Sequence, residues 1–163
     1  MTATLRYYHR EAEITVLGPG LRAVIWLQGC PHRCRGCIIP ESWPVDEGLE
    51  ATCDEICDWL LSCERIEGIT FSGGEPMLQA QALNTVLERV LAKRNLGVVL
   101  YTGYRLEWLQ KQAAPEQLRL LSKIDLLIDG LYEREQHADL LWRGSLNQRL
   151  LQLSDRYKGA IPA

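Results

Sequence analysis

Three cysteines in one short loop are the residues of this chain best suited to chemistry. Cys30, Cys34 and Cys37 follow directly after a mostly apolar run. Three thiolates that lie so close together can hold an iron–sulfur cluster, and a [4Fe–4S] cluster with three protein ligands keeps one iron open. An open coordination position allows a metal site to take a substrate. The loop therefore predicts a [4Fe–4S] cluster that takes part in a reaction.

Zinc is the alternative metal for this loop, with His32 as a fourth ligand. Structural zinc sites are usually built from two pairs of ligands on separated segments. No second pair of that kind is evident in the sequence. The iron–sulfur interpretation is favoured, and a non-catalytic zinc or iron–sulfur binding module stays open as the alternative.

A second group of cysteines, Cys53, Cys57 and Cys63, has a different pattern. All three fall on one short predicted helix, and the fixed spacing of a helix does not wrap three thiolates around a cuboidal cluster. Free cysteine in such a setting behaves as a small apolar residue. We therefore predict that these cysteines are structural.

A glycine pair at the end of an apolar run is the second candidate for chemistry. The segment reads Ser72-Gly73-Gly74-Glu75-Pro76. Two glycines allow backbone groups to approach a ligand closely, and proline stiffens the turn. Glu75 is then placed to bind a cationic amine. Alone, this motif is typical of a plain strand-to-helix turn, but beside the cysteine loop it indicates a binding site.

The elements that must position these residues alternate between strands and helices. A capping-box pattern at Thr52 to Glu55 predicts a helix to about Glu64. Apolar spacing predicts a second helix over 83–91, and further helices follow Gly103 and begin at Pro115, the last with Leu118 and Leu121 inward. The predicted strands are Leu21–Gln28, Gly68–Ser72, Gly97–Thr102, Ile124–Asp129 and Arg149–Leu153.

Alternating strands and helices indicate an α/β fold built from parallel β/α units. A complete eight-fold barrel needs about 250 residues, so this chain has room for about five units. We therefore expect a partial, open barrel in one domain, residues 1–163. Cys30, Gly73, Thr102 and Asp129 all fall at or just after strand ends. They should meet at the C-terminal rim, where such sheets build their sites.

The composition indicates the cellular compartment and excludes some classes of partner. The chain has a net charge of −3 and a pI near 5.7, which gives no basic surface for nucleic acid. No apolar run is long enough to span a membrane, and residues 1–10 lack the pattern of a signal peptide. We therefore expect a cytoplasmic protein. In that compartment clustered cysteines favour metal binding or catalysis over disulfides.

Taken together, the motifs resemble the radical S-adenosylmethionine (SAM) superfamily. Among its members, the chain is similar to the activating proteins of anaerobic ribonucleoside-triphosphate reductase, from about residue 14 to 150. The matching segments, in order, are Gly18–Arg22, Gln28–His32, Gly36-Cys37, Thr70–Pro76, Tyr101–Tyr104, Asp125–Gly130 and Trp142–Gln148.

This resemblance implies a mechanism. Cys30, Cys34 and Cys37 hold one [4Fe–4S] cluster, and SAM binds the open iron. An external donor of the flavodoxin or ferredoxin type reduces the cluster, and SAM is cleaved to a 5′-deoxyadenosyl radical. The radical then takes a hydrogen atom from a glycine of a partner enzyme. Anaerobic ribonucleotide reductase is the expected partner; a pyruvate formate-lyase-like enzyme or a peptide substrate is the alternative.

The resemblance also implies which residues contact the cofactors. Gly73, Gly74 and Glu75 orient the methionyl amine, and Thr102 and Asp129 are candidates to hold the ribose or the carboxylate. Further contacts are expected at Gly36, Cys37 and Ile38. The Trp142–Gln148 segment is expected to serve either partner activation or the architecture of the rim.

Overall fold

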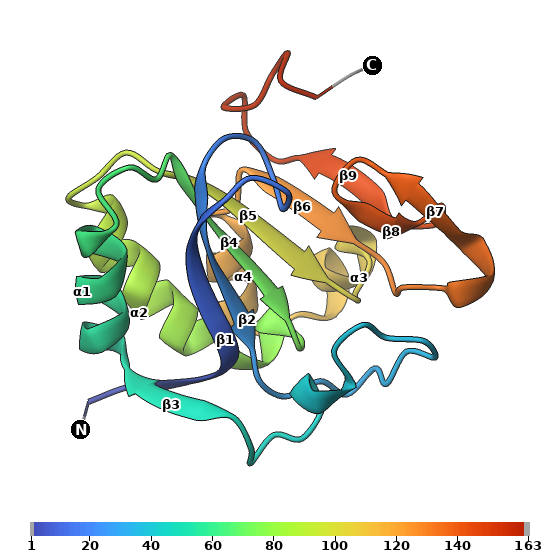
Figure 1. The fold of residues 1–163 in the computed structure, drawn as a ribbon, viewed down its shortest axis with the longest axis horizontal. Coiled ribbons are helices and arrows are strands. Elements are labelled where there is room, and N and C mark those ends of the chain that lie inside the picture. The colour runs from blue at the N-terminus through green and yellow to red at the C-terminus, as the bar shows by residue number, and fades with distance from the viewer. Residues whose placement is uncertain (1, 162–163) are drawn as a thin grey trace.

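A mostly parallel sheet of seven strands forms the centre of the computed structural model, which describes residues 2–161 (Figure 1). Strands β2, β4, β5 and β6 are parallel, whereas β1 and β9 pair antiparallel with β2 and β6. Strand β3 adds to the outer edge of β1. In sheet order the strands are β3 (Leu49–Thr52), β1 (Thr4–Ile14), β2 (Arg22–Leu27), β4 (Gly68–Gly73), β5 (Gly97–Thr102), β6 (Leu126–Asp129) and β9 (Arg149–Gln152).

Helices pack on one face of this sheet through the main hydrophobic core. The helices are α1 (Cys53–Ser62), α2 (Ala80–Leu91), α3 (Leu106–Gln112) and α4 (Pro115–Leu121). Side chains alternate between the two faces of a strand. In β5, Val98 and Leu100 therefore join the core beneath the helices, while Val99 joins a second cluster on the opposite face. In α1, the predicted capping box forms between Thr52 and Glu55.

The C-terminal ends of the parallel strands lie near two loop regions. In Figure 1 the arrowheads of β4, β5 and β6 point toward the loop that follows β2 and toward the hairpin of β7 (His137–Leu140) and β8 (Arg143–Ser145). The C-terminal segment lies at the opposite end of the strands. There, Tyr157 packs partly buried against the second cluster.

A buried arginine ties that C-terminal segment to the strand beginnings. Arg22 is fully buried and donates to the hydroxyls of Thr70 (2.7 Å) and Tyr157 (2.8 Å). It also donates to three backbone carbonyl oxygens, those of Pro19, Ile69 and Gly97. A buried charge of this kind is tolerated only when its donors are satisfied. Arg22 therefore fixes the start of β2 against β4, β5 and the chain end.

All five predicted strands and the four predicted helices are present, with ends shifted by a few residues. Two expectations were wrong, and several strands were not predicted. Within residues 2–161 the sheet has four parallel strands, fewer than the five expected units. Strand β1 was not predicted, because most of its side chains are polar and only Leu5 and Tyr7 are buried. In α4, Leu118 is 42% exposed and Leu120 is buried in its place.

None of the described helices is long and apolar enough to cross a membrane.

The Arg22 contacts predict a specific loss of stability. Replacing Arg22 with Met keeps an apolar stem but leaves buried carbonyls and hydroxyls without a donor. We expect the free energy of unfolding to fall by about 3 kcal/mol. The milder Tyr157→Phe removes one hydrogen bond and should cost about 1 kcal/mol. Urea denaturation followed by circular dichroism measures both, and unchanged midpoints would contradict this role of Arg22.

Candidate active site

A cavity of about 410 Å³ opens at the C-terminal ends of the parallel strands. Its volume is in the range of small-molecule and cofactor sites. Segments that are far apart in the sequence line it: the cysteine loop, the turns after β4, β5 and β6, and the β7–β8 hairpin. Of the residues expected to bind the cluster or SAM, those that line it are Cys30, Cys34, Cys37, Ile38, Gly73, Gly74, Glu75 and Thr102.

The three loop cysteines lie half-buried on one wall, and all six cysteines of the chain are free thiols. The base of the loop is held by backbone hydrogen bonds from Gly29 to Ser42 (2.7 Å) and from Cys30 to Trp43 (3.0 Å). Burial raises the pKa of the Cys30 and Cys34 thiols. Metal binding must therefore displace a proton from each of them.

Three soft thiols on one wall provide the donor chemistry that an iron–sulfur cluster requires. Across residues 2–161, no three His, Cys, Asp or Glu side chains are grouped around a single ion position. His32, the alternative zinc ligand, bonds the Glu75 carboxylate through Nε2 at 2.7 Å. In α1, Cys53 and Cys57 are buried in the core, as expected for structural cysteines.

The glycine turn packs directly on the base of the cysteine loop. Gly74 donates its N–H to the Leu27 carbonyl, and Glu75 donates to the Gly29 carbonyl, both at 2.8 Å. A Cβ atom on Gly74 would lie only 2.4 Å from the Gly29 oxygen. The contact between two backbones thus requires glycine here, whereas the sequence pattern had suggested close approach to a ligand.

Glu75 is buried beneath the cavity wall, with 1% of the residue exposed. One carboxylate oxygen accepts from the Thr102 hydroxyl (2.8 Å) and the Met77 N–H (3.1 Å). The other accepts from the Gly103 N–H (2.8 Å) and from His32. Thr102 was expected to contact the ribose or carboxylate of SAM. In the structure its hydroxyl donates to Glu75 instead. Sequence reasoning missed the partnership between His32 and Glu75, which no local pattern reveals.

Two of the expected contact residues lie outside the cavity lining. Gly36 is exposed in the cysteine loop, where an added Cβ would meet the Arg134 side chain at 3.0 Å. Asp129 is fully buried, but its carboxylate lies on the face of β6 that carries Leu127, the helix side. Ile38, in contrast, lines the cavity and is 86% exposed.

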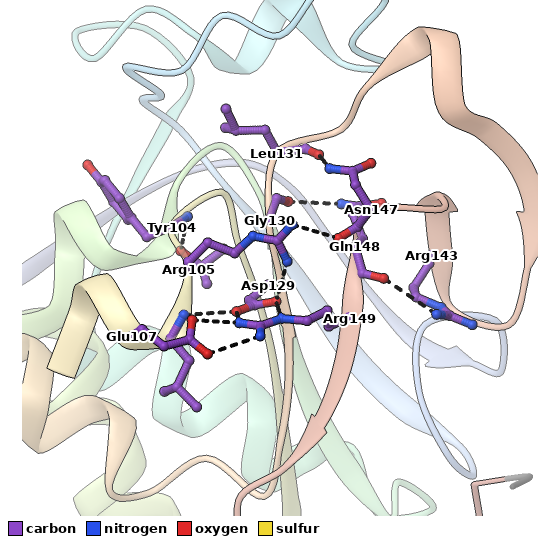
Figure 2. A network of polar contacts seen from close by, with 12 residues as sticks. Tyr104, Arg105, Glu107, Asp129, Gly130, Leu131, Arg143, Asn147, Gln148 and Arg149 are labelled. Atoms are coloured by element: carbon purple, nitrogen blue, oxygen red, sulfur yellow. Dashed lines mark hydrogen bonds and ion pairs between the residues drawn. The ribbon is translucent and has the colours of Figure 1, made fainter.

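Asp129 is the centre of an ion network (Figure 2). Its carboxylate accepts from Arg105 (3.3 Å), from the Leu106 N–H at the start of α3 (2.8 Å) and from Nε of Arg149 (2.9 Å). Arg149 also bonds Glu107 in α3. The contact with Arg149 lowers the pKa of Glu107 to about 2. Asp129 thus anchors α3 and β9 to the end of β6, and this placement opposes a direct cofactor contact.

The Trp142–Gln148 segment holds the neighbouring wall. Gln148 accepts from the N–H groups of Gly144 and Ser145 and donates to the Gly130 carbonyl. Asn147 donates to the Leu131 carbonyl (2.7 Å), as Figure 2 shows. Gly130 and Leu131 line the cavity. Part of this segment is therefore architectural.

Comparison with known proteins gives the chain its family. Residues 16–151 match the family described as a 4Fe-4S single cluster domain, Fer4_12. The anaerobic ribonucleoside-triphosphate reductase-activating protein of Vibrio cholerae is 38% identical over 86% of this chain and 94% of its own length. The proteins of the same name from phage T4 and Escherichia coli K12 are 34% and 31% identical, over 86% of this chain and 89% and 95% of their own lengths.

The chain belongs to the family of anaerobic ribonucleoside-triphosphate reductase-activating proteins. A solved structure with a similar fold is QueE from Escherichia coli, with a TM-score of 0.52 and 16% identity. The match covers 61% of this chain and 52% of QueE. At that identity the likeness concerns the fold alone. The cavity at the C-terminal ends of the parallel strands is the candidate active site of this chain.

The network around Asp129 predicts that its charge supports the rim. Asp129→Asn keeps the shape but leaves Arg105 and Arg149 without their buried anion. We expect the free energy of unfolding to fall by about 2 kcal/mol, because the arginines stay partly solvated. Asp58→Asn, at an exposed position of α1, is the matched control and should change nothing. Thermal and urea unfolding measure both; equal stability of the two variants would contradict the assignment.

Proposed function

We propose that this chain is a radical SAM activase that generates a glycyl radical on an anaerobic ribonucleoside-triphosphate reductase. The names of its relatives support the partner, since the similarity extends over most of each chain. One observation carries the proposal for the site: three free cysteines from a single loop and the glycine turn line the same cavity.

Cys30, Cys34 and Cys37 would hold one [4Fe–4S] cluster and leave one iron open to SAM. When bound, cluster and SAM supply a one-electron reductive cleavage that yields a 5′-deoxyadenosyl radical, able to take a hydrogen atom from a partner glycine. The protein's own task is to position these groups and to exclude water. Around the cavity, the aromatic side chains of Trp26, Tyr101 and Trp142 suit that task.

We further infer that the sheet is a partial, open barrel. Its support is the division of the two faces, with helices on one and the cavity at the rim of the other. An incomplete barrel suits a macromolecular substrate, because a glycine-bearing segment of the partner must reach inside. Ile38, exposed at the cavity wall, suits contact with that segment. The electron would come from a flavodoxin- or ferredoxin-type donor in the cytoplasm, where free thiols persist.

The decisive test is to mix the anaerobically reconstituted protein with the reductase, SAM and a one-electron reductant. Electron paramagnetic resonance should then show a glycyl radical on the reductase, and 5′-deoxyadenosine should accumulate. Cleavage of SAM without a radical on the reductase would contradict the partner. Absence of SAM cleavage would contradict the activity itself.

Alanine substitution of the cysteines separates ligands from structural residues. Cys30→Ala, Cys34→Ala or Cys37→Ala should abolish SAM cleavage, because no fourth cysteine lines the cavity within residues 2–161. The control Cys57→Ala removes a thiol buried in the α1 core and should leave cleavage within about threefold. Production of 5′-deoxyadenosine with a strong reductant is the measurement. Full activity in Cys34→Ala would refute the cluster assignment.

Arg143 lines the cavity, and within the described residues the hydrogen bonds of its side chain are two long ones of 3.4 Å, to the Leu141 and Gln148 carbonyls. We expect Arg143→Ala to keep the cluster and uncoupled SAM cleavage but to lower glycyl-radical yield at least about tenfold, as for a lost charged contact to the partner. Arg65→Ala, at an exposed arginine paired with Glu13, is the control. A normal glycyl signal in Arg143→Ala would remove this residue from the functional set, and loss of folding would assign it to structure.

A further inference from the structure

His32 lies between two of the loop cysteines, yet its side chain turns inward. Only 13% of the side chain is exposed, and Nε2 lies 2.7 Å from a Glu75 carboxylate oxygen. A carboxylate can only accept, so Nε2 is the donor in this bond. The bond joins the loop after β2 to the turn after β4, which are the two motifs of the proposed active site.

Glu75 connects three segments of the rim at once. Its oxygens accept from His32 in the cysteine loop, from Met77 in its own turn, and from Thr102 and Gly103 after β5. A carboxylate offers about four acceptor positions, and these donors fill them. A ligand ammonium would have to displace one of them. Glu75 is therefore suited to hold the rim together, rather than to bind the amine of SAM directly.

Packing also restricts the His32 ring. The ring lies edge-on to Tyr104 at 4.7 Å between centroids, and Tyr104 stacks on Trp108 in α3 at 4.6 Å. A Cβ atom on Gly103 would come within 2.6 Å of the His32 ring. The ring thus occupies a tight space between the cysteine loop and the segment after β5.

A second histidine–glutamate pair lies at the surface of the protein. His9 and Glu11 form the same kind of pair on β1, but the nitrogen and oxygen are 3.3 Å apart and both side chains are more than half exposed. Pairs in that setting contribute little. The short distance and the burial at His32 and Glu75 distinguish a structural bond from a surface contact.

We propose that His32 is a positioning residue that locks the cysteine loop onto the glycine turn through Glu75. It sets where the three cysteines stand relative to the backbone of Gly73 and Gly74. This inference rests on the proposed function for its catalytic consequence. Its structural part concerns the protein without cofactors and can be tested separately.

Three variants separate the hydrogen bond from the packing. His32→Phe keeps an aromatic ring but loses the donor, while His32→Gln keeps an N–H donor at a similar reach. His9→Phe applies the first change to the exposed pair and is the matched control. All three should retain cooperative unfolding.

Amide hydrogen exchange of the protein without cofactors is the first measurement. In His32→Phe, the amides of residues 30–37 and of Gly103 should exchange at least about tenfold faster, because a bond to a buried carboxylate is lost. His32→Gln should stay within about threefold of the wild type, and His9→Phe should match it. Unchanged exchange in His32→Phe, or equal acceleration in the Phe and Gln variants, would overturn the proposal.

SAM cleavage by the reconstituted variants is the second measurement. His32→Phe should raise KM for SAM about tenfold and leave the cluster content unchanged, with His32→Gln close to the wild type. Unchanged KM in His32→Phe would overturn the catalytic consequence. A wild-type protein that cleaves no SAM would overturn the proposed function, and the exchange comparison would still decide the role of His32.

Discussion

The rim of this sheet depends on one buried carboxylate. Glu75 receives donors from segments that follow three different strands, β2, β4 and β5. Loops at the ends of parallel strands have no ladder of hydrogen bonds between them, so some other contact must fix their relative positions. A buried, fully satisfied anion does this with little freedom, because loss of any donor leaves charge unpaired in a low-dielectric interior. The loop cysteines and the glycine turn then face one cavity.

Two further buried charged side chains also hold several elements of the fold together. Arg22 joins the strand beginnings to the C-terminal segment, and Asp129 joins α3 and β9 to the end of β6. Each is fully buried and each bonds groups from several elements. Arg22 lies on the face without helices, because it alternates with Ala23 of the core beneath the helices, whereas Asp129 lies on the helix side. Arg22 thus acts at the strand beginnings, away from the cavity, and Asp129 acts at the end of β6, next to Gly130 of the cavity lining.

Most of the secondary structure could be predicted because periodicity and strand ends are local signals. The cysteines and the glycine turn were placed at one rim correctly, since the carboxyl ends of parallel strands share an edge. Asp129 ends its strand as predicted but does not line the cavity, because a strand end does not reveal which face of the sheet a side chain occupies. Its alternation with Leu127, which packs beneath the helices, would have placed it on that side. The His32–Glu75 hydrogen bond could not be predicted from local sequence patterns, because its partners are 43 positions apart and meet only in the folded chain. Strand β1 was missed because its polar side chains weaken the hydrophobic alternation.

We propose that the cysteine loop and the glycine turn form one centre that binds a cluster and SAM together. The most direct measurement is the electron paramagnetic resonance spectrum of the reduced, anaerobically reconstituted protein, recorded with and without SAM beside iron and sulfide analysis. We expect one [4Fe–4S] cluster per chain and a signal that changes when SAM is added. Stoichiometric zinc without iron, or a cluster signal that SAM leaves unaltered, would contradict it.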